Sequence, residues 1–254
     1  MPKTALMHIS DIHEYSLPAV DHQTLVSSIV SDMSRYSMAE VPIKKPTLLI
    51  VCGDLIRGST TSLEDIEKQY QEAEAFLDIL CNELFNGDRS RVVIVPGNHD
   101  ISWPNSMESM KKLQSTDQSL VKMLVEPKNK VRWNWADLSF YSIVNLERYN
   151  QRLHLFSKFY ESFYKNARKY PLSPDDQFDI FEFESEKLLF VGFNSCFYND
   201  HLNRVGMINP QCITNCHNPI RNNKYEKWIK IAVWHHGIHG LPMQNDFMSE
   251  HIVQ

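Results

Sequence analysis

Residues 92–95, in a predicted strand at residues 91–95, form a β-branched apolar run that stops at a Pro96-Gly97 turn. Three polar side chains follow at once: Asn98, His99 and Asp100. A short apolar run bounded by turn residues is typical of a buried strand. Because α/β sheets build their sites outside the carboxyl ends of their strands, this segment predicts a buried strand with a candidate site at its end.

The same arrangement occurs three more times along the chain. The predicted strands at residues 3–10, 47–52 and 230–234 contain apolar runs that also end in polar side chains that can bind metals. The residues that follow these runs are Asp11 and His13, Gly53 and Asp54, and His235 and His236. Four strand ends of one kind predict that these side chains meet at one edge of the fold.

Helical patterns separate the first three strands. Asp21 is placed to cap a helix, and Ser62 is placed to cap a longer one that ends at Asn86-Gly87. Strands that alternate with helices in this way predict right-handed crossovers and a largely parallel α/β sheet.

The second half of the chain has a different rhythm. Residues 101–170 predict a helical, partly irregular insertion after the third strand, which would form a cap. Residues 178–183 and 188–193 predict a hairpin, and residues 207–229 predict a short helical region. Because no repeat or low-complexity linker divides the sequence, residues 1–254 are predicted to form one domain.

Composition excludes several classes of protein. The net charge of −5 creates no general attraction for nucleic acid. No apolar stretch approaches the roughly 20 residues that span a bilayer, and the first residues show no signal-peptide pattern. The five cysteines are an odd number, and two of them lie inside apolar runs. We therefore expect a cytoplasmic protein without a disulfide framework and without a membrane partner.

The polar residues at the strand ends are of the types that bind transition metals. Asp11, His13, Asp54, Asn98 and His235 offer carboxylate, imidazole and amide ligands. A mixed nitrogen and oxygen set suits manganese, zinc or iron better than magnesium or calcium. A bridging carboxylate can hold two cations about 3.5–4 Å apart, which present a hydroxide in line to phosphorus. The sequence predicts two divalent ions, with Mn²⁺ favoured and Zn²⁺ or iron as alternatives.

The ordered set of motifs resembles the calcineurin-like metallophosphoesterases. The matching segments, which extend from residue 3 to about residue 240, are Asp11-x-His13, Gly53-Asp54 with Gly58, Gly97-Asn98-His99-Asp100, Gly206-Met207-Ile208 with Gln211, and His235-His236. The resemblance implies a two-layer β-sandwich flanked by helices, rather than the plain doubly wound sheet that the alternation of elements predicts.

The resemblance also implies a role for each site residue. Asp11, His13 and Asp54 would hold the first metal, and Asp54 would bridge to a second metal held by Asn98 and His235. Asn98 and His99 would bind the phosphate. His99 is expected to be an imidazole that holds no metal and protonates the leaving group, so His99 and Asp54 are the expected catalytic residues.

One motif of the family has no counterpart in the printed sequence. Members close the site with a Gly-His-x-His motif, and His239 lies too close to His235 to belong to such an element. We expect the chain to be C-terminally incomplete, with further domains or a partner chain completing the site. The alternative is a weakened metal site in a degenerate module that binds or regulates within a larger protein.

Two features predict the substrate class: the absence of protein-phosphatase residues from two motifs, and the basic and aromatic side chains of the insertion. Protein phosphatases of this family have an Asp-Arg pair in the second motif and Glu after Asn-His. Here the segment from Gly53 to Gly58 lacks that Asp and the third motif ends in Asp100, so a protein phosphatase is the weaker alternative. Basic and aromatic side chains interleave in the insertion, and they are Lys128, Lys130, Arg132, Trp133, Trp135, Tyr141, Arg148, Tyr149, Arg152, Lys158, Tyr164, Lys165, Arg168 and Lys169.

Basic and aromatic side chains together suit a nucleotide or a single strand of nucleic acid. Each base that stacks on an aromatic ring contributes about 1–3 kcal/mol. The chain is therefore predicted to be a phosphodiesterase or nuclease acting on a nucleotide or nucleic-acid phosphate ester. The alternative interpretation is an amphipathic helix that packs its rings on the core. Among the remaining candidates, His8 is expected in the core and His236 in a structural role, and the Cys212-x-x-x-Cys216 pair is not expected to bind zinc.

Overall fold

Two three-stranded sheets form the centre of the computed structural model, which describes residues 4–13, 21–38, 44–114, 118–124, 130–239 and 247–248. The first sheet is parallel and consists of β1 (Leu6–Ile9), β2 (Leu48–Cys52) and β3 (Val92–Val95). The second consists of β7 (Phe178–Phe183), β8 (Leu188–Phe193) and β9 (Ile229–Val233). In it β7 is antiparallel and β9 parallel to β8. The sheets meet where β3 lies against β8, because Gly192 leaves room for the side chain of Val95.

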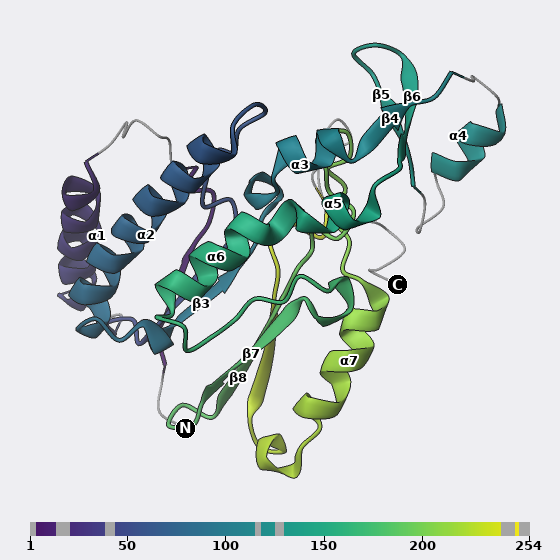
Figure 1. Cartoon of the computed structure of the whole chain (residues 1–254). Helices are drawn as coiled ribbons and strands as arrows, with labels where there is room; N and C mark the ends of the chain where they lie inside the picture. The colour runs from purple at the N-terminus through teal and green to yellow at the C-terminus, as the bar shows by residue number, and fades with distance from the viewer. Residues whose placement is uncertain are drawn as a thin grey trace.

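Helices cover the sheets on both sides. Helices α1 (His22–Ser37), α2 (Leu63–Phe85) and α6 (His154–Phe163) lie on one side, and α7 (Pro210–Ile220) lies on the other (Figure 1). Cys212 and Cys216 on α7 pack against Val191 and Phe193 of β8. The largest core joins both sheets to α1, α2 and α6. This arrangement confirms an α/β fold of packed sheets flanked by helices.

Local sequence signals set the ends of these elements. The Asp21 carboxylate accepts hydrogen bonds from the backbone N–H groups of Gln23 and Thr24, and Ser62 Oγ accepts one from Asp65. Asn86 ends α2 in the left-handed conformation. These caps confirm the predicted helix boundaries, since each satisfies backbone groups that a helix end leaves free. Short 3-10 helices cover Arg89–Arg91, Asn98–Asp100, Gln151–Leu153, Pro174–Asp176 and Asn223–Tyr225.

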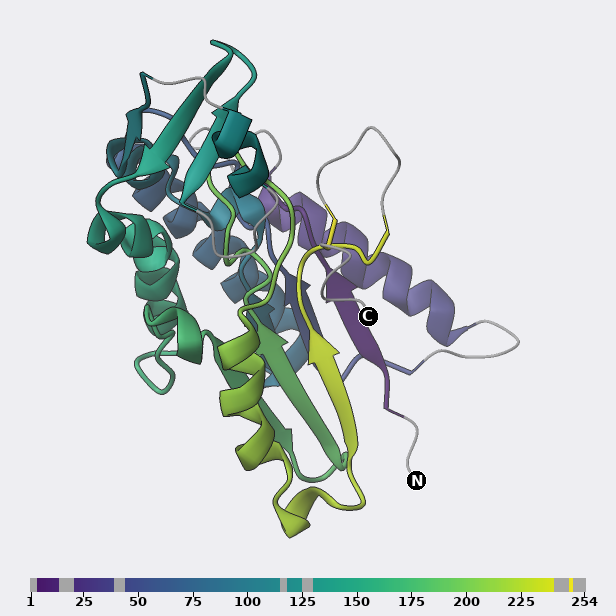
Figure 2. The ribbon, with the colours of Figure 1, turned by 90° about the vertical axis from the view of Figure 1, so that its right-hand side faces the viewer.

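The insertion contains strands in addition to the predicted helices and irregular segments. It contains the helices α3 (Trp103–Glu108), α4 (Gln118–Leu124), α5 (Leu146–Asn150) and α6, and also a sheet made of β4 (Met110–Lys112), β5 (Val131–Asn134) and β6 (Ser139–Ile143). The order of this antiparallel sheet is β4-β6-β5. Figures 1 and 2 show that it projects from the two central sheets together with α4. Strands of three to five residues are too short to show a clear period-2 pattern, so the sequence did not predict them.

The expectation that His8 lies in the core is wrong. Strand β1 pairs with β2 alone among the described residues and so lies at an edge of its sheet. His8 and Leu6 are consequently exposed, while Met7 and Ile9 pack against the core. None of the helices in the segments that the structure describes combines the length and the apolar character needed to cross a membrane.

Candidate metal centre

The loops after β1, β2, β3 and β9 bring the five predicted ligands together. Strands β1, β8 and β9 end toward the same side of the molecule (Figure 2). The Nε2 atom of His13 lies 3.7 Å from Asp11 Oδ1 and 3.7 Å from Asp54 Oδ2. The Nε2 atom of His235 lies 3.5 Å from Asp54 Oδ1 and 2.9 Å from Asn98 Oδ1. Asp54 therefore lies between two groups of candidate ligands.

These groups have the composition of metal sites. Ligand atoms of Asp11, Asp54 and His235 lie within 4.8 Å of one another, and so do those of His13, Asp54 and His99. Asp54 belongs to both groups, as a bridging carboxylate would. The structure thus brings all five predicted ligands together, and how they divide between two ions stays a prediction.

The backbone at three of these residues is in the left-handed region. Asp11, His13 and Asp54 have φ values of 56°, 50° and 51°. Such conformations cost about 1–3 kcal/mol each for residues other than glycine, and they concentrate at functional sites. Two backbone hydrogen bonds hold them, one from Asp11 N to Gly53 O at 3.2 Å and one from His13 N to Asp54 O at 3.0 Å. The fold therefore fixes the side-chain directions of its candidate ligands at a cost in stability.

Two glycines allow the loops after β2 and β3 to touch. A Cβ atom on Gly97 would overlap the backbone nitrogen and the carboxylate of Asp54. A Cβ atom on Gly53, whose φ is 75°, would overlap the backbone of Gly97. The absence of side chains at these two glycines therefore permits direct contact between the two loops.

The donor set fits a cation. His235 Nδ1 lies 2.7 Å from the carbonyl oxygen of Cys52, which can only accept, so Nδ1 holds a proton. Its Nε2 faces the side-chain oxygens of Asn98 and Asp54. Within the described residues the buried Nδ2 of Asn98 has no hydrogen-bond partner, because the amide turns its oxygen toward the site. Nitrogen and oxygen atoms that converge in this way can share a cation, and a backbone partner on the other ring nitrogen is typical of metal-binding histidines.

His99 lies at the edge of this centre. Its backbone N–H donates to Asp54 Oδ1 at 2.9 Å, and its ring lies edge-on to that of His13 with centroids 4.7 Å apart. Nδ1 donates to the carbonyl oxygen of Arg57 at 2.8 Å, which leaves Nε2 available. The half-buried ring therefore has one nitrogen fixed by the backbone and one that can serve the reaction.

Asp100 is a site residue to which sequence reasoning gave no role. It is 1% exposed, and Oδ2 accepts hydrogen bonds from Gly97 N at 2.8 Å and Leu55 N at 3.5 Å. Its Oδ1 lies 3.3 Å from the Tyr70 hydroxyl. Burial, followed by the charge of Asp54, raises the pKa of Asp100 to about 7. Asp100 joins the two ligand loops from behind, and its place at the end of the third motif was the only signal in the sequence.

His236 has the predicted structural role, but its hydrogen bond with Ser195 was not predicted. His236 Nε2 donates to Arg204 O at 3.2 Å, and Nδ1 accepts from Ser195 Oγ at 2.8 Å. Burial and the neighbouring His235 lower the pKa of His236 to about 3, so the ring is neutral. Gly206 packs directly on this ring. His239 is exposed and belongs to neither ligand group.

Four members of the basic and aromatic set of the insertion lie inside the protein, whereas Lys130, Trp135, Lys165 and Lys169 are exposed. Arg132, Arg152, Tyr149 and Tyr164 are all less than 8% exposed. Of the more exposed members, Arg168 and Lys158 pair with carboxylates of Asp179 and Glu67. Packing on the core, the alternative interpretation, therefore describes these buried members, and they offer no surface to a nucleic acid. Lys128 lies outside the described residues.

Comparison with known proteins agrees with this geometry. A family model described as calcineurin-like phosphoesterase matches residues 4–252, which is nearly the whole chain. No curated protein matches the chain. Membership of this family implies phosphoester hydrolysis and divalent metal ions. The chain therefore belongs to the calcineurin-like phosphoesterase family.

Proposed function

We propose that the chain hydrolyses a phosphodiester of a nucleotide or nucleic acid at a centre for two divalent ions, of which Mn²⁺ is the first candidate. Asp11, His13 and Asp54 would hold one ion, and Asp54, Asn98 and His235 the other. When bound, such a pair of ions supplies an activated water and neutralises charge on the phosphate. The observation that carries the proposal is the convergence of candidate ligand atoms of Asp54, Asn98 and His235.

Side chains of the chain would bind the phosphate, donate a proton and stack on a base. Asn98 and His99 would bind phosphate oxygens, and His99, as an imidazolium, would give the proton on Nε2 to the leaving oxygen while Nδ1 keeps its own. The carbonyl of Arg57 fixes the ring that performs this step. Trp103 lies beside His99, with ring centroids 5.9 Å apart, and a base can stack on such a ring for about 1–3 kcal/mol. This ring supports a nucleotide substrate.

Metal dependence tests the proposal. The full chain, stripped with a chelator and then supplied with Mn²⁺, is expected to hydrolyse bis(p-nitrophenyl) phosphate only in the presence of the metal. Elemental analysis is expected to find two ions per chain. An empty site together with no hydrolysis would contradict the proposal and favour a non-catalytic binding module, and turnover restricted to phosphopeptides would favour a protein phosphatase.

Replacing His99 with Asn tests the proton donor. We expect turnover of a diester with a poor leaving group, such as phenol, to fall by about 100-fold, because general acid catalysis contributes on this scale. Turnover of the matching p-nitrophenyl ester should fall much less, since p-nitrophenolate leaves without a proton. His217→Asn on the exposed face of α7 is the matched control. Equal losses for both leaving groups would show that His99 does not donate the proton.

A further inference from the structure

A cationic side chain lies at the edge of the metal centre. The guanidinium carbon of Arg204 is 5.5 Å from the centroid of the Trp103 ring. Trp103 in turn lies 5.9 Å from the His99 ring, and His99 lies 4.7 Å from His13. Arg204 is exposed, whereas Trp103 is half-buried. A chain of ring contacts therefore leads from the ligand His13 to the exposed guanidinium of Arg204.

The surroundings of Arg204 differ from those of most other arginines. Arg89, Arg91, Arg132 and Arg168 each pair with at least one carboxylate. Among the residues that the structure describes, none offers a carboxylate within ion-pair distance of Arg204. An exposed guanidinium that rests on an indole keeps its hydrogen-bond donors available for an anion, because the ring engages only its flat face.

The loop that carries Arg204 is held firmly. Asp200 Oδ1 accepts hydrogen bonds from the backbone N–H groups of Leu202 and Asn203, both at 2.9 Å, and Asn199 donates to Val205 O at 2.8 Å. The carbonyl of Arg204 itself accepts from His236 Nε2. The direction of the Arg204 backbone is therefore fixed relative to the neighbouring ligand, His235.

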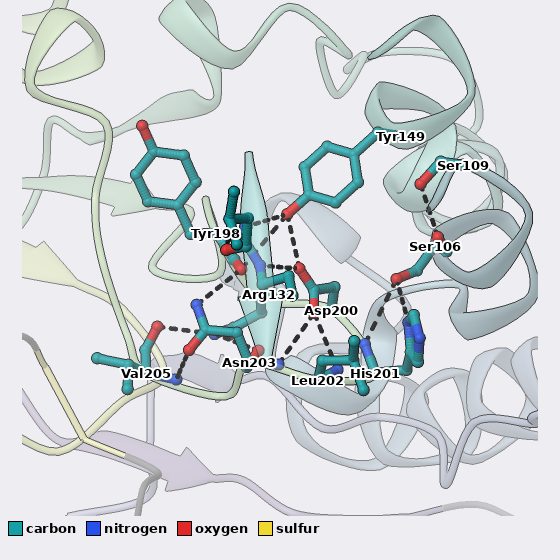
Figure 3. Close-up of polar contacts among 12 residues, drawn as sticks. Ser106, Ser109, Arg132, Tyr149, Tyr198, Asp200, His201, Leu202, Asn203 and Val205 are labelled. Carbon is teal, nitrogen blue, oxygen red and sulfur yellow. Dashed lines mark hydrogen bonds and ion pairs between the residues drawn. The ribbon is translucent and has the colours of Figure 1, made fainter. Parts of the chain in front are cut away.

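The insertion anchors this loop in turn. Arg132 Nε donates to Asp200 Oδ2 at 2.7 Å, and the Tyr149 hydroxyl donates to the same oxygen at 3.0 Å (Figure 3). Both Arg132 and Asp200 are buried. Burial lowers the pKa of Arg132, but the charge of Asp200 and the hydrogen bonds to Asp200 and Tyr149 outweigh it and raise that pKa above its usual range. Arg152 also donates to the carbonyl of Phe197 at 3.1 Å. Two buried arginines of the insertion thus fix the loop on which Arg204 stands.

We propose that Arg204 binds a second phosphate group of the substrate, so that the centre prefers phosphate esters with another phosphate close by. The proposal rests on the proposed function and names its substrate class further. Adjacent phosphates of a nucleotide chain meet this description. Arginine suits the task because its fork of donors matches two phosphate oxygens at once.

A pair of matched esters tests this proposal. Thymidine 5′-(p-nitrophenyl phosphate) and its 3′-phosphorylated form release the same p-nitrophenolate and differ only in the second phosphate. For the full chain with Mn²⁺, we expect Arg204→Gln to raise KM for the 3′-phosphorylated ester by about tenfold, on the scale of one hydrogen bond to a charged group. KM for the other ester and kcat for both should stay unchanged. Arg204→Lys should recover part of the loss, since it keeps the charge without the fork.

Binding supplies a readout independent of turnover. Calorimetric titration should show that Arg204→Gln weakens binding of thymidine 3′,5′-bisphosphate by about the same factor and leaves thymidine 5′-monophosphate unaffected. Arg221→Gln, on the exposed end of α7, is the matched control. Equal changes for both ligands, or none for either, would overturn the role of Arg204. If the wild type hydrolyses neither ester, the proposed function fails, and the titration still decides whether Arg204 reads the second phosphate.

Discussion

Replacing Asp54 with Asn is expected to lower kcat/KM for bis(p-nitrophenyl) phosphate by at least about 1000-fold, because bound metals contribute several kcal/mol to charge stabilisation in such reactions. Asp54 lies in both ligand groups and is 3% exposed, so the substitution removes a charge that both groups share. The amide keeps the size of the carboxylate, and its oxygen can still accept the N–H of His99. The loss should therefore come from metal binding rather than from unfolding.

Steady-state kinetics and elemental analysis measure this effect together. We expect the Asp54→Asn chain to retain fewer metal ions than the wild type while keeping its circular dichroism spectrum. Asp32→Asn on the exposed surface of α1 should change neither quantity. Turnover within tenfold of the wild type in the Asp54→Asn chain would remove Asp54 from the mechanism.

The second large effect is expected from Gly97→Ala, a change that replaces none of the candidate ligands. The added methyl group would occupy the space of the Asp54 backbone nitrogen and carboxylate, so the loops after β2 and β3 must separate. Displacements of about 1 Å in a catalytic group can cost on the order of 100-fold in rate. We expect activity to fall by at least that factor and the melting temperature to fall with it.

Gly237→Ala is the matched control because it lies close to His235 but in open surroundings. A Cβ atom there would come no closer than 3.4 Å to the nearest described atom, His239 O. Activity and melting temperature should therefore stay near the wild-type values. A fully active Gly97→Ala chain would mean that the two loops need not touch in the working site.

Local patterns in the sequence were enough to predict the central elements and the meeting of the candidate ligands at the strand ends. The helix caps at Asp21 and Ser62 depend on neighbouring residues, and the ligands follow strands whose carboxyl ends must meet. The sheet of the insertion could not be predicted because its strands are too short for a periodic signal. The burial of Arg132 could not be predicted either, since it depends on Asp200, which only the fold brings near.

The position of Arg204 illustrates the same limit. Trp103 and Arg204 come from segments that are far apart in the sequence, and no motif links them. Ser195 was missed for a similar reason, because its hydroxyl becomes relevant only when β8 and β9 place it beside His236. Side chains that only the folded chain brings together leave no local pattern in the sequence from which their contacts could be predicted.

The buried ion pair between Arg132 and Asp200 has a consequence for how such a protein can diverge. An unpaired charge left in this position would be strongly destabilising, so a substitution at either residue is tolerated only with a matching change at the other. Strand β5 and the loop that carries Arg204 must therefore be inherited as a unit. If related proteins exchanged the insertion together with the loop that carries Arg204, the preference for substrate would change while every candidate metal ligand stayed the same.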